Sequence, residues 1–306
     1  ASIVRRLGTS PDHFDGSQDI FMQVLVTGAN GFIGFWVCRL LLERGHQVVA
    51  LWYRRRERLD TIAGHPALRV EKGDVLDQEH LAALCARCQI EALCHLAIQP
   101  PQAPGQVNTQ GTLSVLQAGV GRVVFVSSMS VYNFLAPRYV PVDEQHPLEP
   151  LQSYGAQKAL AETCCHTYRE RLEVPILRLA GVYGPGKEQG AAYQFTKAAL
   201  CGLTIEIPVN RSVDLLFVGD AAAAVVAAAE GQAGSDTYNI GSGRALALDE
   251  LARLICRQQH IEVPIACGPP GNTFYLDISR ARQRFGFAPR PLEEGLACLA
   301  DWVKIR

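Results

Sequence analysis

Short apolar runs alternate with longer segments of helical periodicity over the first 180 residues. Most of the runs are rich in Val, Leu and Ile, which is typical of buried strands. The predicted strands are 24–26, 48–53, 68–70, 92–97, 122–127 and 175–179, and the predicted helices are 32–44, 81–88, 108–118 and 154–172. This regular alternation predicts an α/β fold, a doubly wound parallel sheet with helices on both faces.

The pattern becomes less regular after Gly181. We expect one more sheet strand at 238–240 and helices at 246–258 and 278–285, in a smaller C-terminal lobe. The alanine-rich stretch 221–229 is expected to form only a turn or two of packed helix. It is far shorter than the roughly 20 apolar residues that span a membrane.

Residues 1–21 are expected to contribute neither to the fold nor to the chemistry. They show no regular period, contain Arg5, Arg6 and Pro11, and lack the apolar centre of a signal peptide. Because Met22 directly precedes the first predicted strand, we interpret it as the natural start. The preceding segment is then an N-terminal extension or an addition made for expression.

Charge and cysteine usage narrow the class of protein. The 29 basic and 30 acidic residues give a net charge of −1, which predicts neither a nucleic-acid nor a membrane partner. The ten cysteines are scattered through predicted helices and strands, as is typical of reduced thiols in a cytoplasmic protein. Cys85, Cys88, Cys94 and His95 resemble part of a zinc set, but no second well-spaced pair completes it, so no metal is predicted.

Three evenly spaced glycines follow the first predicted strand. Gly28 allows a tight turn, Gly31 lets the backbone approach a pyrophosphate, and Gly34 packs helix against strand. The amides at the start of the following helix would bind the phosphates. The other residues of this predicted dinucleotide-binding turn are Asn30, Phe32 and Ile33.

Tyr154 and Lys158 share one face of a predicted helix. At this spacing the ammonium can lower the pKa of the phenol, which is about 10 when unperturbed. Such a phenol can exchange a proton with a substrate oxygen while a nicotinamide cofactor exchanges hydride. Ser128, with Ser127 and Ser130 beside it, directly follows the fifth predicted strand and is the candidate partner. Together the motifs predict a nicotinamide-dependent oxidoreductase acting on a small-molecule substrate.

The end of the second predicted strand favours NADP. An acidic residue there would bind the ribose hydroxyls of NAD and repel a 2′-phosphate. The stretch 51–56 contains no acidic residue, and Arg54 or Arg55 could pair with a 2′-phosphate. The alternative is a solvated basic loop, and NAD then remains possible.

In this order the motifs resemble the extended branch of the short-chain dehydrogenase/reductase family, which contains nucleotide-sugar epimerases, dehydratases and many ketone reductases. The resemblance runs from Met22 to the C-terminus. It rests on Thr27–Gly34, Gly73-Asp74, His95–Ala97, Asn108-x-x-Gly111-Thr112, the serine cluster, Tyr154-x-x-x-Lys158, Leu177–Pro185 and Asp277–Phe287. It implies a Rossmann domain over 22–180 with a returning strand near 236–240, and a mainly substrate-binding lobe over 181–306.

The resemblance also implies a role for each matched residue. Ser128 would hydrogen-bond the reacting oxygen, Tyr154 would be the general acid/base, and Lys158 would bind the nicotinamide ribose. The remaining positions implied to line the cofactor are Asp74, Val75, Leu96 and Ala97. We interpret the neighbouring His95 as a packed histidine.

Departures from the family pattern favour a non-nucleotide substrate. Met129 and Ser130 stand where dehydratases place an acidic pair, and Gly181 replaces an asparagine usual in nucleotide-sugar epimerases. Val213 and the segment 269–272 lack the arginines that commonly hold a diphosphate in those epimerases. We therefore expect an NADP(H)-dependent enzyme that reduces a carbonyl or oxidises an alcohol. The alternative is a nucleotide-sugar 4-epimerase or related enzyme with retained NAD, and a third interpretation is a cofactor-binding scaffold without turnover.

The helix near Asn108 is expected to be about a turn shorter than usual, because only ten residues separate Ala97 from Asn108. That helix and the Tyr154 helix commonly form the dimer interface in the family. We therefore expect a monomer or a weak homodimer.

Overall fold

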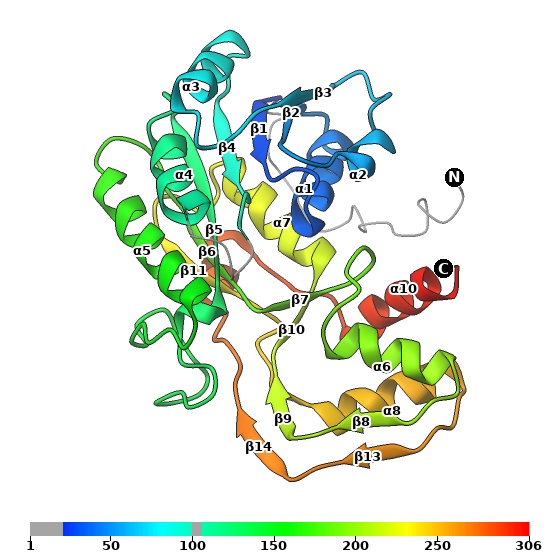
Figure 1. The fold of residues 1–306 in the computed structure, drawn as a ribbon. Coiled ribbons are helices and arrows are strands. Elements are labelled where there is room, and N and C mark those ends of the chain that lie inside the picture. The colour runs from blue at the N-terminus through cyan, green and yellow to red at the C-terminus, as the bar shows by residue number, and fades with distance from the viewer. Residues whose placement is uncertain (1–20, 100–105, 306) are drawn as a thin grey trace.

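The computed structural model describes residues 21–99 and 106–305, with a seven-stranded parallel sheet at its centre (Figure 1). The strand order is β11-β6-β5-β4-β1-β2-β3. The strands are β1 (Gln23–Thr27), β2 (Gln47–Trp52), β3 (Leu68–Lys72), β4 (Ala92–His95), β5 (Arg122–Ser128), β6 (Ile176–Leu179) and β11 (Thr237–Ile240). The chain moves outward from β1 to β3 and then returns to β4 on the other side of β1. This switch leaves a crevice beyond the carboxyl ends of the strands.

Helices cover both faces of the sheet (Figure 1). On one side α1 (Phe32–Glu43) packs against α7 (Val218–Ala229). On the other, α3 (Gln78–Arg87) and α5 (Ser153–Tyr168) flank α4 (Gln106–Leu116). A short helix, α2 (Glu57–Asp60), follows β2, and a 3₁₀ turn, η2 (Met129–Val131), follows β5.

Successive side chains of β1 enter different cores. Val24 and Val26 belong to the hydrophobic core that includes α1 and α7, whereas Leu25 belongs to the core on the face covered by α3–α5. Because neighbouring side chains of a strand point to opposite faces, a sheet covered on both faces requires strands that are apolar throughout. This is the physical reason for the short apolar runs in the sequence.

The C-terminal lobe is built from short strands and helices. Its strands are β7 (Gly181–Tyr183), β8 (Ile205–Ile207), β9 (Asn210–Val213), β10 (Leu215–Phe217), β12 (Leu246–Ala247), β13 (Ile265–Cys267) and β14 (Pro270–Thr273). Its helices are α6 (Ala191–Leu200), α8 (Leu248–Gln259), α9 (Ser279–Phe285) and α10 (Leu292–Lys304). The strands pair in small separate sheets, and α6, α8 and α10 pack against one another.

Buried Asp214 joins three segments of this lobe. Its Oδ1 accepts hydrogen bonds of 2.7 Å from both the backbone N–H and the hydroxyl of Ser242, and its Oδ2 accepts one of 3.0 Å from the Leu276 N–H. Its backbone oxygen accepts a further bond of 3.1 Å from the Gly181 N–H, at the point where the sheet domain meets the lobe. Asp214 is therefore a structural carboxylate.

The predicted α/β fold is confirmed, including the returning strand, since β11 pairs in parallel with β6. The expectation for the alanine-rich segment was wrong, because α7 is a 12-residue helix that begins at Val218. The helix α10 was not predicted. The interpretation of residues 1–21 lies, up to residue 20, outside the described residues, as does much of the spacing between Ala97 and Asn108. Within the described ranges, no helix combines the length and apolar character needed to cross a membrane.

Candidate active site

The glycine turn closes tightly between β1 and α1. Gly28 has a φ of +66°, and a Cβ there would lie 2.7 Å from the Leu96 carbonyl oxygen and the Ala97 nitrogen. A side chain at Gly31 would lie 2.9 Å from the Gly28 oxygen. The turn therefore requires glycine for two reasons, a left-handed backbone and close packing against the end of β4.

This turn fits a dinucleotide pyrophosphate. The first amides of an α-helix have no partner within the helix, and the N-cap of α1 is Gly31, which has no side chain to satisfy them. The first turn of α1, including Phe32 and Ile33, contains no acidic residue that would repel an anion. A phosphate group can therefore approach open N–H groups at the positive end of the helix.

Asn30, predicted to line the cofactor, also holds a neighbouring helix in place. Its Oδ1 accepts from the backbone N–H groups of Arg58 (3.0 Å) and Leu59 (3.2 Å), and so it holds α2 against the glycine turn. Arg58 in turn donates to the Asn30 carbonyl oxygen (3.5 Å) and the Gly186 carbonyl oxygen (2.5 Å). This contact joins the turn to the C-terminal lobe.

The end of β2 is strongly basic. Arg54 and Arg55 are exposed, and the Arg54 guanidinium lies 5.4 Å from the centre of the Tyr53 ring. Neither guanidinium forms an ion pair with any residue that the structure describes. Arg56 differs, because it pairs with Asp60 at 3.1 Å. Two cations thus remain available where the ribose of a dinucleotide would lie.

The remaining predicted cofactor residues lie at the ends of β3 and β4. Asp74 uses Oδ1 to accept from the Leu76 N–H (3.0 Å), and Val75 is buried against α4, where an added Cβ on Gly111 would lie 2.8 Å from it. Leu96 and Ala97 border the glycine turn, and the Ala97 N–H donates to Thr27 Oγ1 (3.3 Å). These positions form one edge of the crevice.

His95 is packed in the core. Its Nδ1 lies 2.8 Å from Thr27 Oγ1, and its Nε2 lies 3.2 Å from Thr112 Oγ1. Burial and the positive charge of Lys158 lower its pKa to about 3, so the ring is neutral. This neutral, fully partnered ring supports the interpretation of His95 as a structural residue.

Ser128 and Tyr154 meet at the carboxyl edge of the sheet. Ser128 ends β5, Tyr154 lies in the first turn of α5, and the Ser128 side chain is close enough to lower the pKa of the Tyr154 phenol. Ser128 Oγ also donates to Ser130 Oγ (3.2 Å) and accepts from the Ser130 N–H (3.2 Å). The pair can therefore hold one substrate oxygen between a hydrogen-bond donor and a proton-exchanging phenol.

Lys158 is buried below this pair. Its Nζ donates to the Val126 carbonyl oxygen (2.8 Å) and lies 4.6 Å from the centre of the Phe125 ring. Burial lowers the pKa of Lys158 to about 8. The pKa of Tyr154 is raised, because burial outweighs its hydrogen bond with Ser128. The direction is opposite to that expected from the Tyr–Lys spacing alone, since the ammonium points at the β5 backbone.

The sequence analysis missed the role of Gly155. A Cβ at this position would lie 2.9 Å from the Ser130 carbonyl carbon and 3.0 Å from Pro150 Cβ, and closer still to the Ser130 oxygen. The absence of a side chain therefore lets α5 contact η2 directly. This contact sets the separation of Tyr154 from Ser128.

The sequence analysis also missed a buried ion pair behind the active site. Glu162 accepts from Arg178 Nε at 3.1 Å and from Nη2 at 2.7 Å, and its Oε1 accepts from Ser127 Oγ at 2.5 Å. Arg178 Nη1 donates to Tyr132 Oη (2.7 Å), which donates to Asn239 (2.9 Å). Glu162 follows Lys158 by four residues on the same helix face, which is the sequence signal that could have revealed it.

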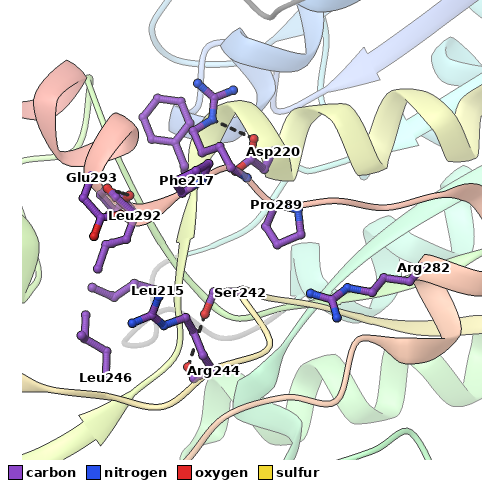
Figure 2. Close-up of a pocket in the computed structure, with 13 residues that line it drawn as sticks. Leu215, Phe217, Asp220, Ser242, Arg244, Leu246, Arg282, Pro289, Leu292 and Glu293 are labelled. Carbon is purple, nitrogen blue, oxygen red and sulfur yellow. Dashed lines mark hydrogen bonds and ion pairs between the residues drawn. The ribbon is translucent and has the colours of Figure 1, made fainter. Parts of the chain in front are cut away.

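A separate cavity of about 340 Å³ opens in the C-terminal lobe (Figure 2). The Asp220 carboxylate accepts from the Arg290 Nε (2.9 Å) on one side of it, and Arg282 points into it from α9. Its lining contains none of the predicted catalytic residues. The lining residues are Tyr183, Leu215, Phe217, Asp220, Ser242, Arg244, Leu246, Arg282, Pro289, Arg290, Pro291, Leu292 and Glu293.

Comparisons with known proteins show the family of this chain. The model of the NAD dependent epimerase/dehydratase family matches residues 24–241. A UDP-glucose 4-epimerase from Mycolicibacterium smegmatis is 32% identical, over 92% of this chain and 99% of the relative. The crystal structure of a Thermotoga maritima UDP-glucose 4-epimerase with UDP-glucose has a TM-score of 0.82 at 25% identity, and covers 93% of this chain and 99% of that one. The Bordetella bronchiseptica enzyme WbmH, solved with NAD⁺, has a TM-score of 0.80 at 28% identity, with coverage of 93% and 99%.

These relatives fit the nucleotide-sugar alternative better than the reduction of a small carbonyl compound, which was our first expectation. WbmH contains NAD⁺, whereas NADP was the cofactor expected for this chain. The family match covers the glycine turn, the Ser128–Tyr154 pair and β11. The chain belongs to the NAD-dependent epimerase/dehydratase family, the extended branch of the short-chain dehydrogenases/reductases.

Proposed function

We propose that the protein is a nucleotide-sugar 4-epimerase that works with a retained NAD. The observation that carries this proposal is the contact between Ser128 and Tyr154 at the crevice of the sheet, in a chain whose relatives include named UDP-glucose 4-epimerases. A UDP-hexose is the substrate class that follows from these relatives.

The proposed chemistry assigns one task to each residue. A bound nicotinamide ring supplies reversible oxidation of the sugar carbon. Tyr154 takes the proton of the adjacent hydroxyl and later returns it, while Ser128 holds the same oxygen by a hydrogen bond. Lys158, whose ammonium lies below the pair and donates to the Val126 carbonyl oxygen, would bind the nicotinamide ribose. The proton and hydride both return to the substrate, so no net redox change accompanies inversion.

A second candidate is an NADP(H)-dependent reductase of a small carbonyl compound. This reductase is favoured by the basic end of β2, which carries Arg54 and Arg55. The stretch 51–56 contains no acidic residue that could bind the ribose hydroxyls of NAD. Two departures from the usual epimerase pattern also favour the reductase. Val213 stands in place of an arginine, and Gly181 stands in place of an asparagine. The two candidates use the same Ser128–Tyr154 pair and differ in cofactor and substrate.

One set of assays separates them. The purified protein is incubated with UDP-glucose or UDP-galactose, and the product sugars are separated by anion-exchange chromatography. The epimerase interconverts them with no net change in NAD, and Tyr154→Phe lowers the rate by roughly 10²- to 10⁴-fold. NAD affinity of this variant should stay unchanged. If the protein does not interconvert nucleotide sugars but consumes NADPH with simple carbonyl compounds, the epimerase proposal is wrong and the reductase is correct.

A further inference from the structure

The segment 184–187 of the C-terminal lobe packs directly against the glycine turn. Trp36 Nε1 donates to the Pro185 carbonyl oxygen (3.2 Å), and the Arg58 guanidinium donates to the Gly186 oxygen. The Phe32 ring covers Gly186, where an added Cβ would lie 3.4 Å from its Cδ2. The next residue along this segment is Lys187, so its side chain begins beside the N-terminus of α1.

Lys187 is a half-buried cation that forms no ion pair with any described residue. Its Nζ donates to the Val182 carbonyl oxygen (2.8 Å) and lies 5.9 Å from the centre of the Phe32 ring. Burial alone lowers its pKa, and among the described residues no carboxylate acts against that effect. A buried ammonium costs free energy unless it is paired, so a lysine held here is poised for an anion.

The surroundings of Lys187 suit a doubly charged group. The open amides of α1 provide hydrogen-bond donors and the positive end of a helix, and Arg58 adds a second cation between the turn and Gly186. By contrast, Val213 stands at the end of β9 where epimerases commonly have an arginine, Arg211 of the same strand lies two residues earlier, and β14 begins with Pro270. Lys187 would supply, from another element, positive charge that the position of Val213 lacks.

We propose that Lys187 binds a diphosphate group across the junction of the two lobes, exchanging its hydrogen bond to Val182 for phosphate oxygens. This inference deepens the proposed function, since both NAD and a nucleotide sugar carry a diphosphate. It assigns to the C-terminal lobe a direct role in holding charged ligand at the glycine turn.

Isothermal titration tests this with Lys187→Met, which keeps most of the length of the side chain and removes the charge. Lys187→Arg is the conservative variant. Lys197→Met is the matched control, because Lys197 is an exposed lysine of the same lobe, on α6, whose ammonium lies 5.9 Å from the Tyr193 ring. Each variant is titrated with NAD and, separately, with UDP, and thermal melting confirms that it is folded.

We expect Lys187→Met to weaken binding of one of the two ligands about tenfold to a hundredfold, the effect of losing one charged hydrogen bond. Loss confined to NAD identifies the cofactor pyrophosphate as the partner, and loss confined to UDP identifies the substrate diphosphate. Lys187→Arg should retain most of the affinity. Unchanged affinity for both ligands in folded Lys187→Met, or equal losses in Lys197→Met, overturns the proposal.

Neither titration requires turnover. An inactive protein whose NAD or UDP affinity depends on Lys187 would refute the epimerase and leave this inference standing. An active epimerase whose affinities for NAD and UDP do not depend on Lys187 would support the proposed function and refute this inference.

Discussion

Replacing Gly155 with alanine should damage the active site more than the fold. The new Cβ would lie 2.9 Å from the Ser130 carbonyl carbon and 3.0 Å from Pro150 Cβ. Carbon atoms prefer separations of about 3.5–4.0 Å, so the start of α5 must move away from η2 by roughly 1 Å. Tyr154 is the preceding residue and moves with it, away from Ser128.

The expected magnitudes follow from this displacement. A shift of about 1 Å in a catalytic group can cost on the order of 10²-fold in rate. Overpacking of this kind costs about 1–3 kcal/mol of stability. We therefore expect a folded Gly155→Ala protein with a rate lowered roughly 10²-fold, since most of the loss arises from geometry.

The assay combines interconversion of UDP-glucose and UDP-galactose with thermal melting. Gly64→Ala is the control, because a Cβ at Gly64 meets no atom within 4 Å. It should match the wild type in rate and melting temperature. A Gly155→Ala protein with the wild-type rate would refute the argument that the α5–η2 contact positions Tyr154.

Two further predictions concern buried charges behind the site. Glu162→Gln leaves Arg178 buried without its carboxylate and should lower the free energy of unfolding by about 3–5 kcal/mol in urea titrations. The control is Glu170→Gln, at an exposed position, which should change the free energy of unfolding little. Equal effects of the two substitutions would contradict the role of the buried pair. The pKa of Lys158 is about 8 in the folded protein, below its ordinary 10.5. Between these values the unfolded chain binds more protons, so this lysine makes stability rise with pH. Subtracting the urea stability of Lys158→Met from that of the wild type at pH 8 and pH 10.5 should reveal the rise, and a flat difference would show that the ammonium is not desolvated.

The local elements of the fold were readable from the sequence. Apolar runs such as 24–26 are strands because both faces of the sheet are covered, and the glycines from Gly28 to Gly34 specify a tight turn into a helix. The small strands β7–β10 were harder to predict, because three or four residues carry too little periodicity. The helix α10 does carry helical spacing, with Leu296, Leu299 and Ala300 buried, and the sequence analysis overlooked it. The extent of α7 was underestimated for a related reason, since its uniform alanines give no amphipathic pattern.

The active-site residues divide in the same way. The spacing of Tyr154 and Lys158 placed both on one helix face, and the serine cluster placed Ser128 at a strand end. The sequence did not predict that Lys158 would donate to the Val126 carbonyl oxygen, or that burial would raise the pKa of Tyr154. Those properties depend on what surrounds each group after the chain has folded.

The sequence by itself determined the sheet, the dinucleotide turn and the residue types available for proton exchange, because these are set by short-range periodicity and backbone freedom. Only the tertiary structure decided that burial raises the pKa of Tyr154, that Glu162 pairs with Arg178, and that Lys187 lies beside Phe32. The last contact joins residues 155 positions apart. Packing between distant segments controls distance and burial, and these control the charge of each group and the ligand it can hold.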